Sequence, residues 1–154
     1  MAKITDVTQE YMDNARPKNG KLIYEQGYNQ KIHQDEIAMG TWLHAVFGGN
    51  VILLKENTQY YGVKTPDFLW NDAFWEMKRL STNNQNTING RIRKAFEQID
   101  SNRGGVIIDI TNSKLTMEQA KHNITKSALR RVRGVTDVII KKGQSYSIFR
   151  IKKE

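Results

Sequence analysis

The chain has 154 residues, the size of one compact domain with its own hydrophobic core. It contains no cysteine, which excludes a disulfide framework and a thiolate zinc site. No apolar run approaches the ~18 residues that cross a membrane, and the first residues lack the apolar region of a signal peptide. We therefore expect a soluble domain with no membrane segment. It could be one part of a larger protein.

The net charge of +8 at pH 7 is unevenly distributed along the chain. Residues 1–78 hold 8 Lys and Arg against 10 Asp and Glu, a net charge of −2, whereas residues 79–154 hold 16 against 6, a net charge of +10. A strongly basic segment is typical of proteins that bind polyanions such as nucleic acid. Basic residues that only solvate surface helices give the same count, so composition leaves both interpretations open.

The first part of the chain gives no clear structural signal. Residues 1–28 show no sustained periodicity and contain several Asn, Gly and Pro residues, so we expect an irregular lead-in to a single domain over residues 29–154. A helix is predicted from about Asn29 to Phe47, because two glycines follow it directly.

This first helix carries a carboxylate on its apolar side. Glu36 lies four residues after Ile32 and seven before Leu43, so it shares their inward stripe. A carboxylate on a buried face is costly unless it is paired or binds a metal. Glu36 could instead reach the edge of the stripe or pair with Lys31, but the hairpin that follows favours a functional role.

A β-hairpin is predicted over residues 66–78. The turn dipeptide Asn71-Asp72 separates two aromatic-rich runs, which is typical of two paired strands. A two-residue loop at this dipeptide would pair Trp70 with Ala73.

In that register the hairpin brings three charged residues together. Asp67 falls opposite Glu76, with Cβ atoms about 4.5–5.5 Å apart, and Lys78 shares a face with Glu76 because strand side chains alternate. Two carboxylates at this separation repel each other unless a cation lies between them or one is protonated. The hairpin therefore predicts a divalent-metal site with a lysine beside it.

The remaining elements complete the expected fold. A second amphipathic helix is predicted over residues 88–99, with Arg91, Lys94 and Gln98 along one side, where they either line a groove above the metal site or form a solvated face. The order of elements predicts an α/β or α+β fold with a mixed central sheet and helices on its faces. Further elements are predicted as strands over 51–54, 106–110, 135–141 and 146–151 and a helix over 117–133 capped by Thr116.

The pattern Pro66-Asp67, eight residues, then Glu76-Met77-Lys78 resembles the signature of the PD-(D/E)xK nuclease superfamily. The elements over about residues 30–110 look like the restriction-endonuclease-like α-β-β-β-α-β core of that superfamily, here followed by a C-terminal helix and β-hairpin. More narrowly, residues 36–78 are similar to the C-terminal toxin domains of contact-dependent growth inhibition (CdiA-type) proteins, which are nucleases that degrade DNA or tRNA.

This resemblance implies a metal-dependent endonuclease that hydrolyses phosphodiester bonds of DNA or tRNA. Asp67, Glu76 and Glu36 would bind the metal, which we expect to be Mg²⁺ or Mn²⁺ because hard cations prefer oxygen ligands, with Zn²⁺ as the alternative. Lys78 would orient the attacking water or stabilise the transition state. The candidate substrate-binding residues are Arg91, Arg93, Lys94 and Gln98.

The resemblance also implies a biological setting. It predicts a toxin that acts in the cytoplasm of the cell it enters, delivered as part of a larger secreted protein. An acidic immunity protein is the expected partner, because the second half of the chain is basic.

Three other functions fit parts of the sequence. A non-catalytic basic nucleic-acid-binding domain would explain the charge asymmetry but not the clustered carboxylates. A metal-independent RNase would use His33, His44 or His122, yet the first two are eleven residues apart on one helix, ~16 Å, too far to share a phosphate. A structural assembly domain would need Lys64 and Lys78 to pair with the carboxylates.

Overall fold

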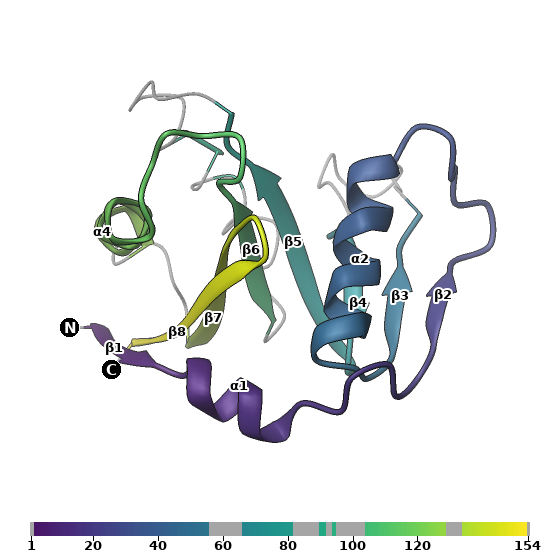
Figure 1. Ribbon diagram of the computed structural model, residues 1–154, viewed down its shortest axis with the longest axis horizontal. Helices are drawn as coiled ribbons and strands as arrows, with labels where there is room; N and C mark the ends of the chain where they lie inside the picture. The colour runs from purple at the N-terminus through teal and green to yellow at the C-terminus, as the bar shows by residue number, and fades with distance from the viewer. Residues whose placement is uncertain are drawn as a thin grey trace.

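The computed structural model describes residues 2–55, 66–81, 90–91, 94, 104–128 and 134–153. The described strands form one eight-stranded sheet in the order β1-β8-β7-β6-β5-β4-β3-β2 (Figure 1). No helix in these ranges is long and apolar enough to cross a membrane. The elements are β1 (Ala2–Asp6), α1 (Thr8–Asn14), β2 (Leu22–Tyr24), α2 (Gln34–Val46), β3 (Val51–Leu53), β4 (Phe68–Trp70), β5 (Ala73–Arg79), β6 (Gly105–Asp109), α4 (Met117–Ala128), β7 (Val135–Lys142) and β8 (Ser145–Lys153).

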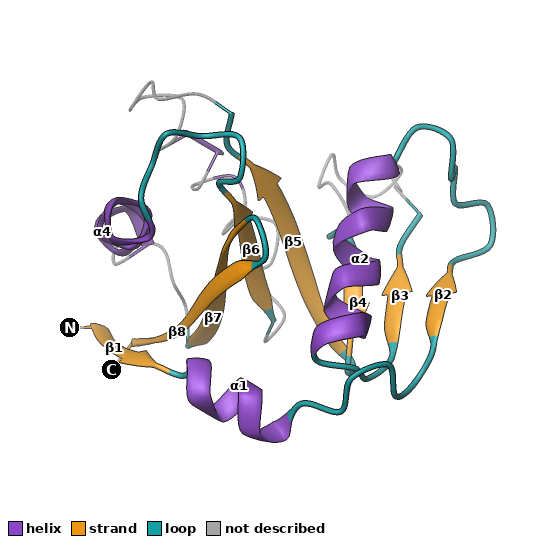
Figure 2. Cartoon of the chain, in the orientation of Figure 1, coloured by secondary structure: helices purple, strands orange, loops and turns teal. Residues whose placement is uncertain are grey.

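The sheet is mixed, which confirms the predicted fold class. Strands β5, β6 and β7 are parallel to one another, and so are β2 and β3, while the other neighbouring pairs are antiparallel. The parallel strands at the centre end at the same edge of the sheet, and the helices lie beside the sheet rather than within it (Figure 2).

Each face of the sheet has its own hydrophobic core. In β6, Val106 and Ile108 point to the face where Ile124 of α4 packs. Ile107, between them, points to the other face, where Leu43 of α2 packs. Because strand side chains alternate, a residue of β5 faces α2 or α4 according to its position in the register.

The N-terminal segment is regular where the sequence predicted an irregular lead-in over residues 1–28. Strand β1 pairs antiparallel with β8, with Ala2 opposite Lys153, and β2 pairs parallel with β3. The two chain ends consequently lie close together (Figure 1). Both strands are short and lie at the two edges of the sheet, so their pairing depends on partners elsewhere in the chain and not on a local pattern.

The predicted hairpin register is confirmed. Trp70 pairs with Ala73, and Phe68 pairs with Trp75. Asn71 and Asp72 both have positive φ, 48° and 66°. Two central residues in the left-handed region form the turn whose twist matches the flanking strands, and Asn and Asp tolerate this region better than most residues.

Helix α2 begins five residues later than predicted. Ile32, expected on its inward stripe, precedes the helix and is 68% exposed. The side chain of Asn29 accepts a hydrogen bond from the amide of Lys31 at 3.0 Å, so a local turn takes the place of the first helical turn. The helix ends as predicted, because Gly48 has a φ of 72° and its amide closes on the carbonyl groups of the last turn.

The C-terminal half follows the sequence prediction where it is described. Thr116 and Gln119 exchange side-chain to backbone hydrogen bonds of 3.1 and 3.0 Å, which form a capping box at the start of α4. Strands β7 and β8 form the predicted hairpin. Of the helix predicted over residues 88–99, residues 90, 91 and 94 are helical, and the others lie outside the described residues.

Gly105 tests the packing between β5, β6 and β7. A Cβ atom at this position would lie 2.2 Å from the indole ring of Trp75 and 2.6 Å from the backbone oxygen of Asp137. We expect Gly105→Ala to lower the free energy of unfolding by about 1–3 kcal/mol, because the backbone oxygen of Asp137 cannot move away from the added methyl group without disturbing the pairing of β6 with β7. Urea denaturation measures this. Gly90→Ala is the control, since no atom of the described residues lies within 4 Å of its Cβ position. Equal stability of the two variants would contradict the packing described.

Candidate functional site

Asp67 lies at the point where strands β4 and β5 separate. The backbone ladder ends at the Phe68–Trp75 pair, and the Asp67 Oδ2 atom then accepts a hydrogen bond from the backbone amide of Met77 at 2.8 Å. The Asp67 carbonyl oxygen accepts from the amide of Leu54 at 3.0 Å, which ties the residue to the end of β3. Asp67 is therefore buried and held rigidly, with only 8% of the residue exposed.

Glu76 and Lys78 lie on β5 and share one face of the sheet. They are in register with Val106 and Ile108 of β6, whose side chains belong to the core beneath α4. Glu76 is fully buried, whereas Lys78 is half-buried and forms no ion pair with any residue that the structure describes. A carboxylate at this depth is costly unless another group compensates its charge.

Glu36 extends from the first turn of α2 and is held by two aromatic neighbours. The Tyr28 hydroxyl donates to Glu36 Oε1 at 3.2 Å, and His33 Nδ1 lies 3.0 Å from Glu36 Oε2. The Glu36 side chain is 16% exposed. Glu36 therefore faces inward, as predicted. Its hydrogen-bond donor Tyr28 belongs to the segment for which the sequence predicted no regular structure.

Burial and the negative charge of Asp67 both raise the pKa of Glu36 above its ordinary value, and burial is the larger cause. The His33 ring and the Tyr28 hydroxyl act in the opposite direction. The pKa of Tyr28 is raised as well, first by burial and then by the charge of Glu36. Asp67 and Glu36 are therefore close enough to repel each other. The sequence predicted this proximity only by assigning both residues to one metal site.

The structure thus brings Asp67 near Glu36 and next to the strand that carries Glu76 and Lys78. In the described part of the chain, no group of three or more His, Asp or Glu residues is arranged to hold a metal ion. The donor chemistry nevertheless fits a hard divalent cation, because the acidic groups at this place offer carboxylate oxygens. A cation between them would also offset the repulsion that raises the pKa of Glu36.

The predicted substrate-binding residues are only partly described. Arg91 donates a hydrogen bond of 3.4 Å to the backbone oxygen of Arg79 at the end of β5. Both arginines line a cavity of about 300 Å³ together with Asp35 and Asp109. Lys94 is exposed. The other two predicted residues, Arg93 and Gln98, lie outside the described residues.

Arg79, which follows Lys78, lines the same cavity as Arg91 but was not singled out from the sequence. Arg79 lies at the carboxyl end of β5 in register with Asp109 of β6, and Asp109 is in register with Lys141 of β7. Its guanidinium is 4.0 Å from the carboxylate of Asp35, and both side chains are more than 40% exposed, so the pair adds little stability. The sequence signal for Arg79 was its position at the end of a predicted strand, because ligand-binding residues collect at strand ends in sheets with parallel strands.

The three histidines do not form a common site. His33 contacts Glu36 at the start of α2, whereas the Nε2 atom of His44, near its end, lies 3.1 Å from the backbone oxygen of Gly20. His122 is exposed on α4. This separation agrees with the sequence argument against a metal-independent RNase that uses two of them.

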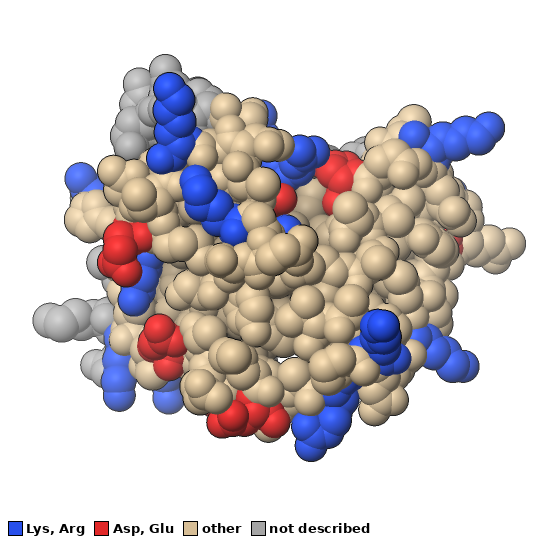
Figure 3. Space-filling view, in the orientation of Figure 1, with Lys and Arg blue, Asp and Glu red and all other residues tan. Residues whose placement is uncertain are grey.

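Basic side chains do not form one continuous patch on the face seen in Figure 3. Lys and Arg lie mostly around its edge, Asp and Glu interrupt them, and the centre is uncharged. On this face, the Lys and Arg side chains of the described residues are therefore spread out rather than concentrated.

Comparison with known proteins points to one family. The model of the contact-dependent growth inhibition CdiA C-terminal domain matches residues 64–145, more than half of the chain. Among solved structures, the chain is similar to the CdiA-CT/CdiI toxin and immunity complex from Burkholderia pseudomallei, with 14% identity and a TM-score of 0.51 over 83% of this chain and 98% of that one. At this identity the likeness concerns the fold alone. No curated protein matches the chain.

The interaction between Asp67 and Glu36 can be tested by titration. We expect Asp67→Asn to lower the pKa of Glu36, because removing a neighbouring negative charge favours the ionised carboxylate. The pKa should stay above its ordinary value, since burial is the larger cause. NMR titration of the Glu36 carboxyl carbon, with EDTA present, measures the shift. Asp72→Asn in the exposed hairpin turn is the control. An unchanged pKa of Glu36 in the Asp67→Asn variant would refute the electrostatic interaction between Asp67 and Glu36.

Proposed function

The chain belongs to the contact-dependent growth inhibition CdiA C-terminal domain family, and we propose that it is a metal-dependent endonuclease whose site is built on β5. The observation that supports this most directly is the burial of two carboxylates, Asp67 just before β4 and Glu76 on the neighbouring β5, with the half-buried Lys78 two residues after Glu76. Ionisable groups that are buried at one place are a common feature of functional sites.

We assign metal binding to Asp67 and Glu76, with Glu36 completing the shell directly or through water. Mg²⁺ or Mn²⁺ suits these oxygen donors best, and Zn²⁺ is the alternative. Such a metal would polarise the scissile phosphate and lower the pKa of a bound water. The hydrogen bond from the Met77 amide to Asp67 fixes the carboxylate before any ion binds, which reduces the entropy lost on binding.

Lys78 has an electrostatic and orienting role in this proposal. Lys78 is half-buried and makes no ion pair with the described residues, and in this proposal its ammonium group donates to a phosphate oxygen or to the attacking water. In a partly water-excluded site a fixed cation stabilises the negative charge that develops on the transferring phosphate. Rigid attachment to a central strand keeps this cation in place during the reaction.

The proposed substrate is DNA or tRNA. Arg91, near the end of β5, and Lys94 on the same helical segment are the described candidates for contacts to backbone phosphates, and Arg93 and Gln98 complete the set. The net charge of +10 over residues 79–154 would attract either polyanion.

The family also suggests how the domain is used. CdiA C-terminal domains are toxins that a larger secreted protein delivers into target cells. We propose that this domain acts in the cytoplasm of the target cell and that an acidic immunity protein neutralises it. The structurally similar chain comes from a complex of toxin and immunity protein.

The nuclease proposal predicts that Lys78→Ala lowers metal-dependent cleavage at least about 100-fold, because it removes one fixed donor from the transition state. Plasmid DNA and total tRNA are incubated with wild-type or variant protein in Mg²⁺, Mn²⁺, Zn²⁺ or EDTA. Asp67→Ala should abolish cleavage, but it also removes the acceptor of the Met77 amide, so thermal unfolding of each variant is measured in parallel.

Asp72→Asn is the matched control, since it changes an exposed carboxylate of the same hairpin and should cleave like wild type. If Lys78→Ala retains cleavage within a few-fold, the assigned site is wrong. Salt-sensitive binding without cleavage under any metal would replace the enzyme by a nucleic-acid-binding domain.

The toxin proposal predicts that expression of this domain in a bacterial cell without its partner stops growth, and that Lys78→Ala relieves the arrest. Colony counts after induction measure both. Co-expression of a cognate immunity protein should restore growth of cells that make the wild-type domain. A wild-type domain that cleaves nucleic acid in solution but leaves growth unaffected would refute the toxin proposal while sparing the nuclease.

A further inference from the structure

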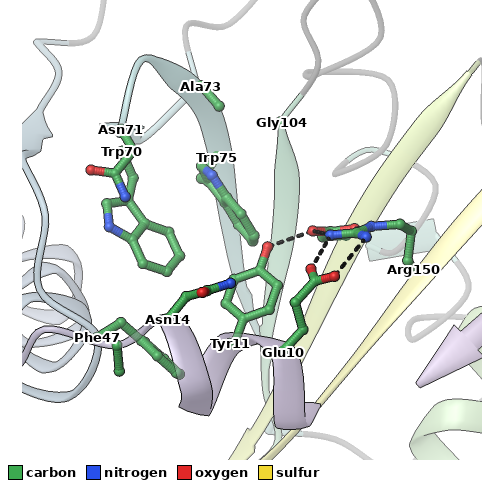
Figure 4. A pocket seen from close by; sticks show the side chains of 12 residues that line it. Glu10, Tyr11, Asn14, Phe47, Trp70, Asn71, Ala73, Trp75, Gly104 and Arg150 are labelled. Atoms are coloured by element: carbon green, nitrogen blue, oxygen red, sulfur yellow. Dashed lines mark hydrogen bonds and ion pairs between the residues drawn. The ribbon is translucent and has the colours of Figure 1, made fainter. Parts of the chain in front are cut away.

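A second cavity lies on the face of the sheet covered by α2, near the start of β5 (Figure 4). Its volume is about 290 Å³, close to the lower limit for small-molecule sites. Ala73 and Trp75 of β5 line it, whereas Glu76 and Lys78 point to the opposite face. Trp75 and Lys78 are three positions apart on β5, which is ~10 Å along the strand at about 3.3 Å per residue, and the sheet lies between the cavity and Lys78.

Aromatic rings form the inner walls of this cavity. The ring centroids of Trp70 and Trp75 are 5.1 Å apart, and that of Tyr11 is 6.2 Å from Trp70. The indole of Trp70 is fixed by a 3.0 Å hydrogen bond to the backbone oxygen of Gly48. The indole of Trp75 packs against Gly105, where no side chain would fit. The two indole rings are therefore held in place before any ligand enters, with their planes tilted by 56°.

The polar side of the cavity is already internally paired. Arg150 donates to Asp137 at 2.7 and 3.0 Å and to Glu10 at 2.8 Å, and the Tyr11 hydroxyl donates to Asp137 (Figure 4). Burial, then the charge of Asp137, raises the pKa of Tyr11, so its hydroxyl stays protonated. One guanidinium shared by two carboxylates leaves no free positive charge for a phosphate.

Two amides at the edge of the cavity retain hydrogen-bonding capacity. Asn14 of α1 is exposed, and its side chain makes no hydrogen bond with the described residues. Asn71 uses its Oδ1 atom to accept from the amide of Asn50 at 3.1 Å, and its NH₂ group makes no bond within the described part of the chain. An amide offers the donor and acceptor pair that matches the edge of a nucleobase.

We propose that this cavity binds an unpaired nucleobase of the nucleic-acid substrate, with its ring against the aromatic walls and its edge toward Asn14 and Asn71. Aromatic stacking combined with edge hydrogen bonds is how proteins read bases that are splayed out of a strand. The absence of a free cation among the described lining residues favours the base over the phosphate. This inference rests on the proposed function, which identifies the ligand as part of a nucleic acid. Such a site would give the enzyme a preference among substrates through contacts that do not involve the reacting phosphate.

The test uses the four ribonucleosides, which lack phosphate and therefore bypass the proposed catalytic site. Each is titrated into the wild-type domain in EDTA and followed by NMR chemical shifts of the tryptophan indole groups. We expect at least one ribonucleoside to bind. Asn14→Ala should weaken its affinity about 3- to 10-fold, because one hydrogen bond is lost. Met12→Ala on the same helix is the control, since Met12 is 50% exposed and lies outside the cavity.

Two further variants separate this proposal from the nuclease proposal. Ala73→Leu should block the nucleoside by filling the cavity, and Lys78→Ala should bind it like wild type while losing cleavage. The proposal is overturned if no nucleoside binds, or if Asn14→Ala and Met12→Ala bind equally. Binding of N-acetyltryptophanamide without any nucleoside would make the occupant an aromatic side chain of a protein. If the wild type binds a nucleoside but has no nuclease activity, the nuclease proposal fails and the nucleobase site stands.

Discussion

The register of the β4–β5 hairpin is the constraint on which the rest of the structure depends. Asn71 and Asp72 adopt positive φ, and this turn decides which residues of β5 face α2 and which face α4. Glu76 and Lys78 fall on one face and Trp75 on the other. A slip of one residue would exchange these faces, so one turn fixes both the proposed catalytic residues and the aromatic cavity.

Burial of negative charge gives the site its chemical character. The carboxylates of Asp67, Glu76 and Glu36 all lie at least partly inside the protein, where charge is poorly solvated. Asp67 is stabilised by a backbone amide, and Glu36 by Tyr28 and His33. The raised pKa of Glu36 shows that this compensation is incomplete. A divalent cation would complete it, which links the stability of the site to the proposed activity.

The N-terminal segment connects the two halves of the molecule. Strand β1 closes one edge of the sheet against β8, and β2 closes the other against β3. Helix α1 between them brings Tyr11 to Asp137 of β7 and Glu10 to Arg150 of β8. The segment thus builds one wall of the aromatic cavity, and its last residue, Tyr28, supports Glu36. It is structurally part of the site region rather than an appendage.

The sequence by itself determined the elements whose signals are local. Turn chemistry at residues 71–72 set the hairpin register, and helical periodicity placed Glu36 on the inward side of α2. The capping of α4 by Thr116 was equally readable. Only the tertiary structure decided that β1 and β2 are strands and that Tyr11, Asp137 and Arg150 share a cavity. Their partners lie far away in the chain, up to about 150 positions for β1, and a contact between distant residues leaves no periodic trace in either segment.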